Sequence, residues 1–322
     1  MKFTAIVGNP PYQINDGGAG ASATPIYNKF IDIAKKISPT YISMITPSRW
    51  FAGGKGLDRF RDEMSRDKRI RSIYNFINGK ECFPTASTGS INYFLWDKNY
   101  EGMCAFTTIK GGENNVRMRT LDEFNVVIGD NVAISIINKV QNKGYGSFCS
   151  NVMPYMPFGL RSYVRGQDKE FPGSVKLYSS AGLSYYKRDD IKECVDIIDK
   201  YKILSSKLLS EHAGEPSKSG QYKVLSRTEI IDPNTVVTES YLILSASDSI
   251  EEIQNTYRYC CTKFFRFLLL QYMSSINMTK EVFKFVPKLD MSKEWTDKEL
   301  YSEFGLTKEE IDYIESIIKP ME

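Results

Sequence analysis

IVGNPPYQ, residues 6–13, sets two adjacent prolines directly after a short apolar run. The prolines remove two backbone donors and fix two φ angles, and Pro10 also pushes Asn9 toward an extended conformation. The stretch therefore predicts a stiff, pre-shaped bend that presents one amide side chain, Asn9, and one aromatic ring, Tyr12.

Short apolar runs and amphipathic stretches alternate around this bend. Residues 3–7 (FTAIV) are typical of a buried strand, and Thr24-Pro25 predicts the start of a helix over 26–37, with Thr24 as N-cap. The further expected elements are a strand at 41–46 ending in the turn PSRW, a polar helix at about 56–66, and paired strands at 70–76 and 90–96. This alternation predicts an α/β sheet, in which functional residues gather beyond the carboxyl ends of the strands.

The pattern changes at about residue 105. A connector over 105–147, containing a hairpin and a helix at 130–141, leads into a region of short strands and turns. Thr296 and Thr307, each followed three residues later by Glu, predict capping boxes on two short helices. The other expected elements are a helix at 189–204, a strand pair near 222–244 and an aromatic-rich helix near 250–273. We therefore divide the chain into residues 1–104, 105–147 and 148–322.

The composition narrows the class of protein. The chain has 322 residues and a formal net charge of +3, so no basic tail indicates nucleic acid, although a local patch is compatible with this sum. Its six cysteines form no CxxC pair and it has one histidine, which argues against a metal site. The longest apolar stretch, around 264–270, is too short to span a bilayer and contains Arg266. We expect a cytoplasmic protein with reduced thiols, without a signal peptide or membrane contact.

Four segments carry a resemblance to a known family. They are NPPY at 9–12, IYNKF at 26–30, ITPSRWF at 45–51 and CFPTAST at 82–88. Together they resemble the catalytic half of TaqI-like, gamma-group adenine-N6 DNA methyltransferases of restriction–modification systems, from about residue 3 to 98. The resemblance implies a partial Rossmann-like methyltransferase sheet, S-adenosyl-L-methionine as methyl donor and double-stranded DNA as substrate.

The chemistry of the motif agrees with this resemblance. The exocyclic amine of adenine is a poor nucleophile, because its lone pair is delocalised into the ring, and two acceptors on its N–H groups oppose that delocalisation. The resemblance assigns catalysis to Asn9, Pro10, Pro11 and Tyr12, and implies that Tyr12 and Phe83 stack on a flipped target base. Methylation at cytosine-N4 uses a similar motif that usually begins with Ser, so Asn9 favours adenine.

Donor binding is incomplete in this interpretation. The resemblance implies that Phe30 packs near the adenine ring of the donor, with Tyr27 and Asn9 beside it, although Phe30 also suits a helix core. In the family a strand, a Gly-containing turn and an acidic residue precede NPPY, and we expect this donor motif to be absent from the chain. The sheet would then have an unpaired edge, and the chain would need a protein partner or a missing N-terminal half. The alternatives are a non-catalytic DNA-binding specificity subunit and an inactive fragment.

Residues 148–322 lie where the family keeps a mixed α+β target-recognition domain. Basic residues there are interleaved with aromatic residues, which suits phosphate contacts and base-edge readout. Ordinary solvated charges are the alternative for each of them. The predicted DNA-binding residues are Arg161, Arg165, Lys187 and Arg188.

Overall fold

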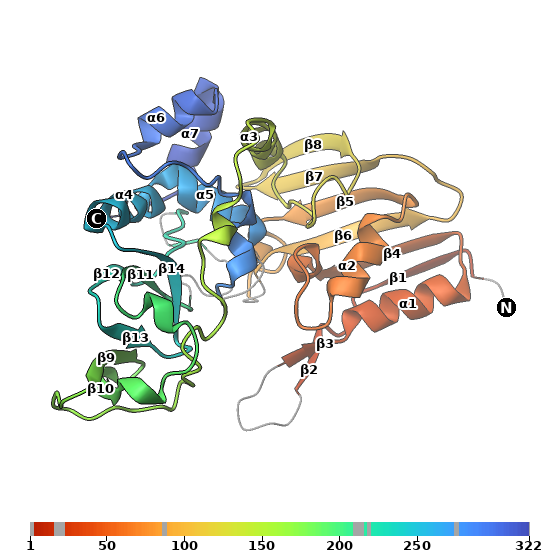
Figure 1. The fold of residues 1–322 in the computed structure, drawn as a ribbon. Helices are drawn as coiled ribbons and strands as arrows, with labels where there is room; N and C mark the ends of the chain where they lie inside the picture. Colours follow the sequence, from red (N-terminus) through yellow and green to blue (C-terminus); the bar gives the residue numbers. More distant parts are fainter. Residues whose placement is uncertain are drawn as a thin grey trace. The chain divides into compact units, whose positions relative to one another are not determined.

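The computed structural model of the chain describes residues 3–15, 23–85, 89–208, 216–217, 220–273 and 277–321. The chain forms two compact units that divide between Ser135 and Ile136, and Figure 1 labels their elements. The predicted connector over 105–147 differs from this division, since its first part forms two strands of the first unit. Both strands are paired along their length with neighbours in the sheet, and the local sequence does not reveal this pairing.

A six-stranded sheet organises the first unit, in the order β1-β4-β6-β5-β7-β8. The pairs β1–β4 and β5–β7 are parallel, and the other neighbouring pairs are antiparallel. This mixed sheet with its helices confirms the predicted α/β class. Its strands are β1 (Ala5–Gly8), β4 (Tyr41–Pro47), β5 (Ile70–Phe76), β6 (Ile91–Asp97), β7 (Cys104–Lys110) and β8 (Glu113–Arg119).

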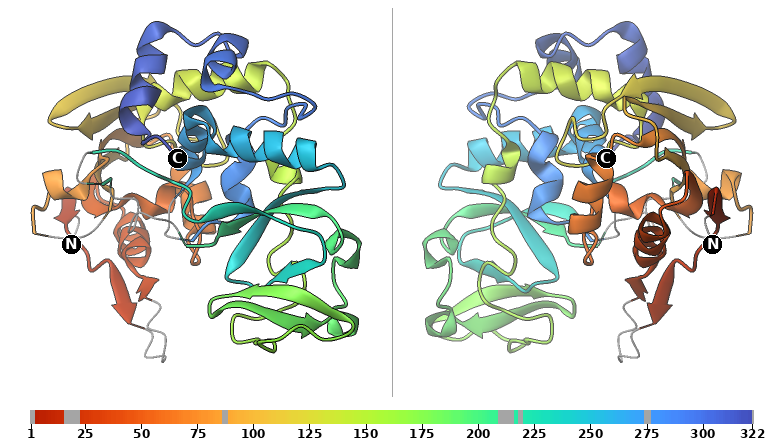
Figure 2. Two further views of the ribbon diagram at one scale, coloured as in Figure 1. Left: turned by 90° about the vertical axis from the view of Figure 1, so that its left-hand side faces the viewer. Right: turned by 90° about the vertical axis from the view of Figure 1, so that its right-hand side faces the viewer.

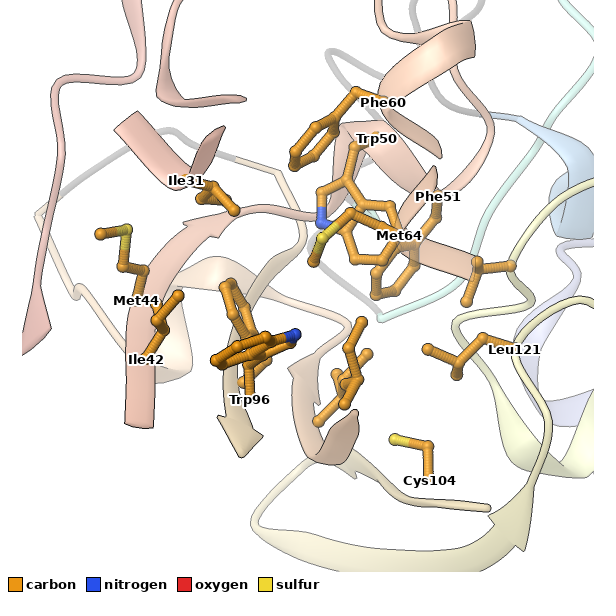
Figure 3. Packing of buried hydrophobic residues seen from close by; sticks show 14 of the residues in the cluster. Ile31, Ile42, Met44, Trp50, Phe51, Phe60, Met64, Trp96, Cys104 and Leu121 are labelled. Atoms are coloured by element: carbon orange, nitrogen blue, oxygen red, sulfur yellow. The ribbon is translucent and has the colours of Figure 1, made fainter. Parts of the chain in front are cut away.

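Two helices supply the core of the first unit. The helix α1 (Tyr27–Ile37) buries Tyr27, Ile31 and Ala34, and α2 (Asp58–Ser65) buries Phe60 and Met64. Figure 3 shows Ile31, Phe60 and Met64 gathered with Ile42 and Met44 of β4 and with Trp50. The alternation of buried residues along β4 follows from the two-residue period of a strand, which sends every second side chain into this core.

The strand β1 corrects one prediction. Residues 3–7 were expected to be buried, yet β1 is the edge strand of the sheet and the side chain of Val7 is 77% exposed. On the outer side of α1, Phe30, Ile33 and Ile37 are 40%, 54% and 47% exposed. An apolar sequence favours a strand, but only a neighbour in space can bury it, and none of the described strands except β4 pairs with β1.

The start of α1 corrects a second prediction. Thr24 and Pro25 belong to β3 (Ala23–Pro25), which pairs with β2 (Gln13–Asn15) in a small antiparallel hairpin. The N-cap of α1 is Ile26, which makes no side-chain capping hydrogen bond. Thr24 and Pro25 form a strand of this hairpin and do not start the helix, because the strand ladder pairs Gln13 with Pro25.

The second unit combines two small sheets with a group of helices (Figure 2). The sheets have the strand orders β10-β9-β13 and β12-β11-β14. Their strands are β9 (Ser174–Ser179), β10 (Gly182–Lys187), β11 (Tyr201–Ser206), β12 (Thr228–Ile231), β13 (Thr235–Val237) and β14 (Tyr241–Ser247). The helices are α3 (Asn131–Asn142), which begins in the first unit, α4 (Ile250–Cys261), α5 (Lys263–Tyr272), α6 (Asp297–Glu303) and α7 (Lys308–Ile317).

The second unit confirms some local predictions and corrects others. Both capping boxes are present, on α6 and α7. The helix expected at 189–204 is wrong, because its C-terminal part is β11, the central strand of its sheet. The helix expected at 250–273 is two helices, since Thr262 ends α4 and caps α5 with its side chain. Among the described helices, none has the length and apolarity needed to cross a membrane.

Candidate active site

Three of the predicted segments meet at one edge of the first sheet. NPPY directly follows β1, and Thr46 and Pro47 end β4, which is parallel to β1 with Gly8 opposite Met44. A short 3-10 turn, Gly79–Glu81, follows β5 and leads into Cys82 and Phe83. Since β5 and β4 both run antiparallel to β6, the carboxyl ends of β1, β4 and β5 lie at the same edge.

The NPPY bend is anchored on both sides of its exposed amide. Pro10 is buried, while Asn9 and Pro11 are exposed. The backbone oxygen of Tyr12 accepts a hydrogen bond of 3.1 Å from the amide of Ile26, which ties the end of the bend to the start of α1. No hydrogen-bond partner for the side chain of Asn9 exists among the described residues. The amide is therefore held in place by its backbone and is available to a ligand.

Tyr12 lies beside the turn that carries Phe83. Burial raises the pKa of Tyr12, and the neighbouring thiol of Cys82 raises it further. The Phe83 amide donates to the backbone oxygen of Gly79 at 2.8 Å, and the Phe83 side chain is half-buried. The two predicted base-stacking residues thus come from adjacent segments, although they are about 70 residues apart in the sequence.

A network of hydrogen bonds between buried polar side chains holds the segments at this edge of the sheet together. The hydroxyl of Ser48 donates to Oδ1 of Asn75 at 2.6 Å, and the hydroxyl of Ser90 donates to the same oxygen at 3.1 Å. Nδ2 of Asn92 donates to the hydroxyl of Ser48 at 3.2 Å, and Nδ2 of Asn75 donates to the backbone oxygen of Gly129 at 3.0 Å. Sequence reasoning missed these residues, because polar side chains from two strands and the segments beside them have no common spacing.

The two aromatic residues predicted to bind the donor, Phe30 and Tyr27, differ in their exposure to solvent. Phe30 is exposed on α1 and offers a free aromatic face, which suits an adenine ring. The prediction that Tyr27 contacts the donor is wrong, because its side chain is 1% exposed. Its ring packs edge-to-face on Phe60, with 6.2 Å between the ring centroids. Tyr27 and Phe30 are three residues apart, about 60° around the helix axis, so they lie on neighbouring parts of the same side of α1, and only Tyr27 is turned fully into the core.

Tyr27 also reveals a residue that the sequence did not single out. Its hydroxyl is buried, lies next to the backbone amide of Trp50 and interacts electrostatically with Arg49. Arg49 belongs to the 3-10 turn Ser48–Phe51 that follows β4, so it lies at the same edge as NPPY. The signal for Arg49 was present only as the single charged residue of the turn SRWF.

The four predicted DNA-binding residues of the second unit differ in their electrostatic partners. Arg188 pairs with Asp199, with Nη1 at 2.7 Å from Oδ1, and Arg161 pairs with Glu239 at 3.4 Å. Arg165 and Lys187 are exposed and have no carboxylate partner among the described residues. The backbone groups of Gln167 and Tyr185 exchange two hydrogen bonds of 2.8 Å, which brings the segments of these two cations together.

The comparisons with known proteins point in one direction. Residues 1–83 match a family model described as "Eco57I restriction-modification methylase". The chain is 37% identical over 112 residues to a Mycoplasma pneumoniae protein described as "Uncharacterized adenine-specific methylase". This match covers 34% of the chain and 26% of that relative, so the chain spans about a quarter of the relative's length.

Solved structures with low similarity are also restriction–modification enzymes. One is the Type IIL enzyme MmeI in complex with DNA, with a TM-score of 0.43, 9% identity, and coverage of 87% of this chain and 45% of that chain. Another is a nuclease-deletion mutant of the Type ISP enzyme LlaGI in complex with a DNA substrate mimic. Its TM-score is 0.43 at 12% identity, over 88% of this chain and 34% of that chain.

Proposed function

We propose that the chain carries the methyl-transfer edge of a DNA methylase that modifies adenine at N6 within a restriction–modification system. The observation that carries this proposal is the Asn9 amide, which is exposed, has no partner among the described residues, and stands on a bend braced by two prolines. The family match over residues 1–83 and the identity to an adenine-specific methylase support it.

In the proposed mechanism the bend holds the target amine. Oδ1 of Asn9 and the backbone oxygen of Pro10 accept hydrogen bonds from the two N–H groups of adenine N6, which leaves the nitrogen lone pair free for attack. Tyr12 and Phe83 hold the flipped base by stacking, as base-modifying enzymes require. S-adenosylmethionine supplies the methyl group when bound, and Phe30 offers an aromatic face for its adenine ring. Fixed positions for both reactants account for the rate without a covalent nucleophile.

The open side of the sheet supports a donor-binding segment next to β1. On an edge strand, alternate backbone N–H and C=O groups point away from the paired neighbour and stay unpaired. The exposed side chain of Val7 lies on this strand, and Phe30, Ile33 and Ile37 form an apolar stripe on the outer side of α1. We propose that a strand–helix segment carrying the donor site, from the same longer chain or from a partner, covers both surfaces.

The proposed DNA binding by the second unit rests on two exposed cations that have no carboxylate partner among the described residues. Arg165 and Lys187 have no carboxylate among the described residues, so they are available to phosphates. The charges of Arg161 and Arg188 are offset by Glu239 and Asp199. We therefore propose that Arg165 and Lys187 contact the DNA backbone, while the other two cations hold their own loops.

The experiment that tests the proposed function identifies the product. The full-length protein, or the complex that contains this chain, is incubated with labelled S-adenosylmethionine and duplex DNA, and the nucleosides are separated by mass spectrometry. The proposal predicts labelled N6-methyladenine. Labelled N4-methylcytosine would replace the adenine assignment, and DNA binding without any methylated nucleoside would favour the non-catalytic specificity subunit.

A further inference from the structure

Arg49 carries a half-buried charge that no carboxylate among the described residues neutralises. Its side chain is partly enclosed in the turn after β4, and its Nε is buried without a hydrogen-bond partner. Burial lowers the pKa of Arg49, and among the described residues the hydroxyl of Tyr27 opposes this effect. Within the described part of the chain, no carboxylate or carbonyl oxygen accepts a hydrogen bond from this guanidinium.

Two other arginines of the first unit, one buried and one partly buried, have carboxylate partners. Arg119, which is almost fully buried, pairs with Glu123 at 2.8 Å and lies over the ring of Phe106 at 4.0 Å. Arg61 pairs with Asp62 at 2.9 Å. Because a desolvated charge without a partner costs free energy, native structures pair such groups unless a ligand completes them.

The groups around Arg49 are also ones that favour a negative ligand. Tyr27, whose buried hydroxyl interacts electrostatically with Arg49, is the first residue of α1, and α1 has neither a side-chain cap nor an acidic residue in its first turn. Arg49 itself stands one strand inward from NPPY, at the edge where the target base is proposed to bind. A guanidinium beside a hydroxyl suits the oxygens of a phosphate.

We propose that Arg49 binds a backbone phosphate of the DNA strand whose base enters the NPPY site. This inference rests on the proposed function, which places DNA at this edge. The donor segment is proposed to cover the open side of β1, whereas Arg49 follows β4, on the other side of β1. The position therefore favours a DNA phosphate over the carboxylate of the donor, although both present the same oxyanion chemistry.

The first arm of the test measures DNA affinity of the full protein against salt. Arg49→Met should weaken binding of a duplex roughly tenfold and reduce the slope of log K against log salt by about 0.9, the value for one lost phosphate contact. Arg49→Lys should recover the slope, since it keeps the charge, but only part of the affinity. The matched control is Arg71→Met, an exposed arginine of β5 paired with Asp97 at 3.6 Å, which should change neither.

The second arm separates a binding role from a structural one. We expect phosphate to raise the unfolding midpoint of the wild-type protein more than chloride does at equal ionic strength, and Arg49→Met to lose this difference. Arg49→Met should also unfold at or above the wild-type midpoint without phosphate, because it removes an unpaired charge. A lower midpoint with an unchanged salt slope would overturn the proposal and make Arg49 structural.

Two further outcomes would also overturn the proposal. If Arg49→Met loses S-adenosylmethionine binding but keeps the wild-type salt slope, the oxyanion is the donor carboxylate. If the wild-type protein gains no stability from phosphate and Arg49→Met binds DNA normally, no oxyanion site exists there. Asn9→Ala should keep the full salt slope, so loss of methylation and loss of the phosphate contact are measured independently.

Discussion

Asn9, Tyr12 and Arg49 share one property at the level of single residues: each presents a polar group without a partner among the described residues. Ser48 and Asn75, at the same edge of the sheet, are hydrogen-bonded to each other and to further buried groups. Buried polar groups in folded proteins are normally satisfied. The contrast therefore separates residues that hold the edge together from residues that are free to bind a substrate.

Asp67, which precedes β5 at the opposite end of that strand, is a buried carboxylate with several hydrogen-bond partners, and it predicts a pH dependence. Burial alone would raise the pKa of Asp67, but hydrogen bonds from Arg69, Lys35 and Trp96 lower it to about 2. A depressed carboxyl pKa contributes stability above the unfolded value, near 3.9, and the contribution is lost as pH falls toward 2. We expect about 2 kcal/mol of unfolding free energy at neutral pH to be lost between about pH 5 and pH 2.

The measurement is denaturant unfolding of the wild-type protein and Asp67→Asn across this pH range. Asp67→Asn should be less stable at pH 7, and the two unfolding free energies should converge as pH falls. Asp122→Asn, at an exposed carboxylate, is the control and should follow the wild type throughout. A constant difference between wild type and Asp67→Asn from pH 7 to pH 2 would contradict the assignment.

At the level of elements, helix α1 carries apolar side chains both toward the core and on an exposed face. Tyr27, Ile31 and Ala34 face the core, while Ile33 and Ile37 are exposed on the other side. A helix that is apolar on both sides is normally buried on both sides. The neighbouring edge strand β1 is open as well, so the two elements together define one surface for the proposed donor segment.

Ile33→Lys tests this surface. The side chain is exposed within the unit, so the stability of the chain by itself should change by less than about 0.5 kcal/mol. Methylation by the full-length protein or complex should fall strongly, because a lysine would be buried against the donor segment without a partner. The comparison requires thermal unfolding and methyl-transfer rates on the same preparations.

Val116→Lys provides the matched control, because Val116 is an exposed apolar residue of β8, at the opposite edge of the sheet. It should leave both stability and methylation unchanged. If Ile33→Lys methylates at the wild-type rate, the stripe on α1 is not an interface. If it unfolds the isolated chain, the stripe belongs to the unit's own core.

The limits of sequence reasoning become clear at the level of the whole molecule. The strand at 70–76 and the capping boxes at Thr296 and Thr307 were predictable, because their signals are local. The exposure of Val7 and the strand at Tyr201–Ser206 were not, since both depend on neighbours distant in the sequence. Apolar residues near 200 fit a helix as well as a central strand buried on both sides.

The candidate site shows the same division. The motif at 9–12 and the turn at Cys82–Phe83 were predicted from their residue types. Strands that run in the same direction bring them to one edge of the sheet. The burial of Tyr27 and its electrostatic interaction with Arg49 were missed, because a helix and a turn come together there only after folding. Residue types therefore indicated the chemistry, while the fold was needed to distinguish accessible side chains from buried ones.

Methyl transfer by Asn9→Ala is the most direct measurement of the central claim. The readout is N6-methyladenine formed on duplex DNA by the full-length protein or complex, with DNA affinity measured in parallel. Asn114→Ala, at an exposed asparagine of β8, is the matched control and should retain wild-type activity. We predict that Asn9→Ala loses methylation by at least about a hundredfold, comparable to the loss of one preorganised hydrogen-bonding group at a reacting centre, while its DNA affinity stays unchanged. Methylation at the wild-type rate by Asn9→Ala would contradict the account, because the exposed amide could then not be the group that holds the target amine.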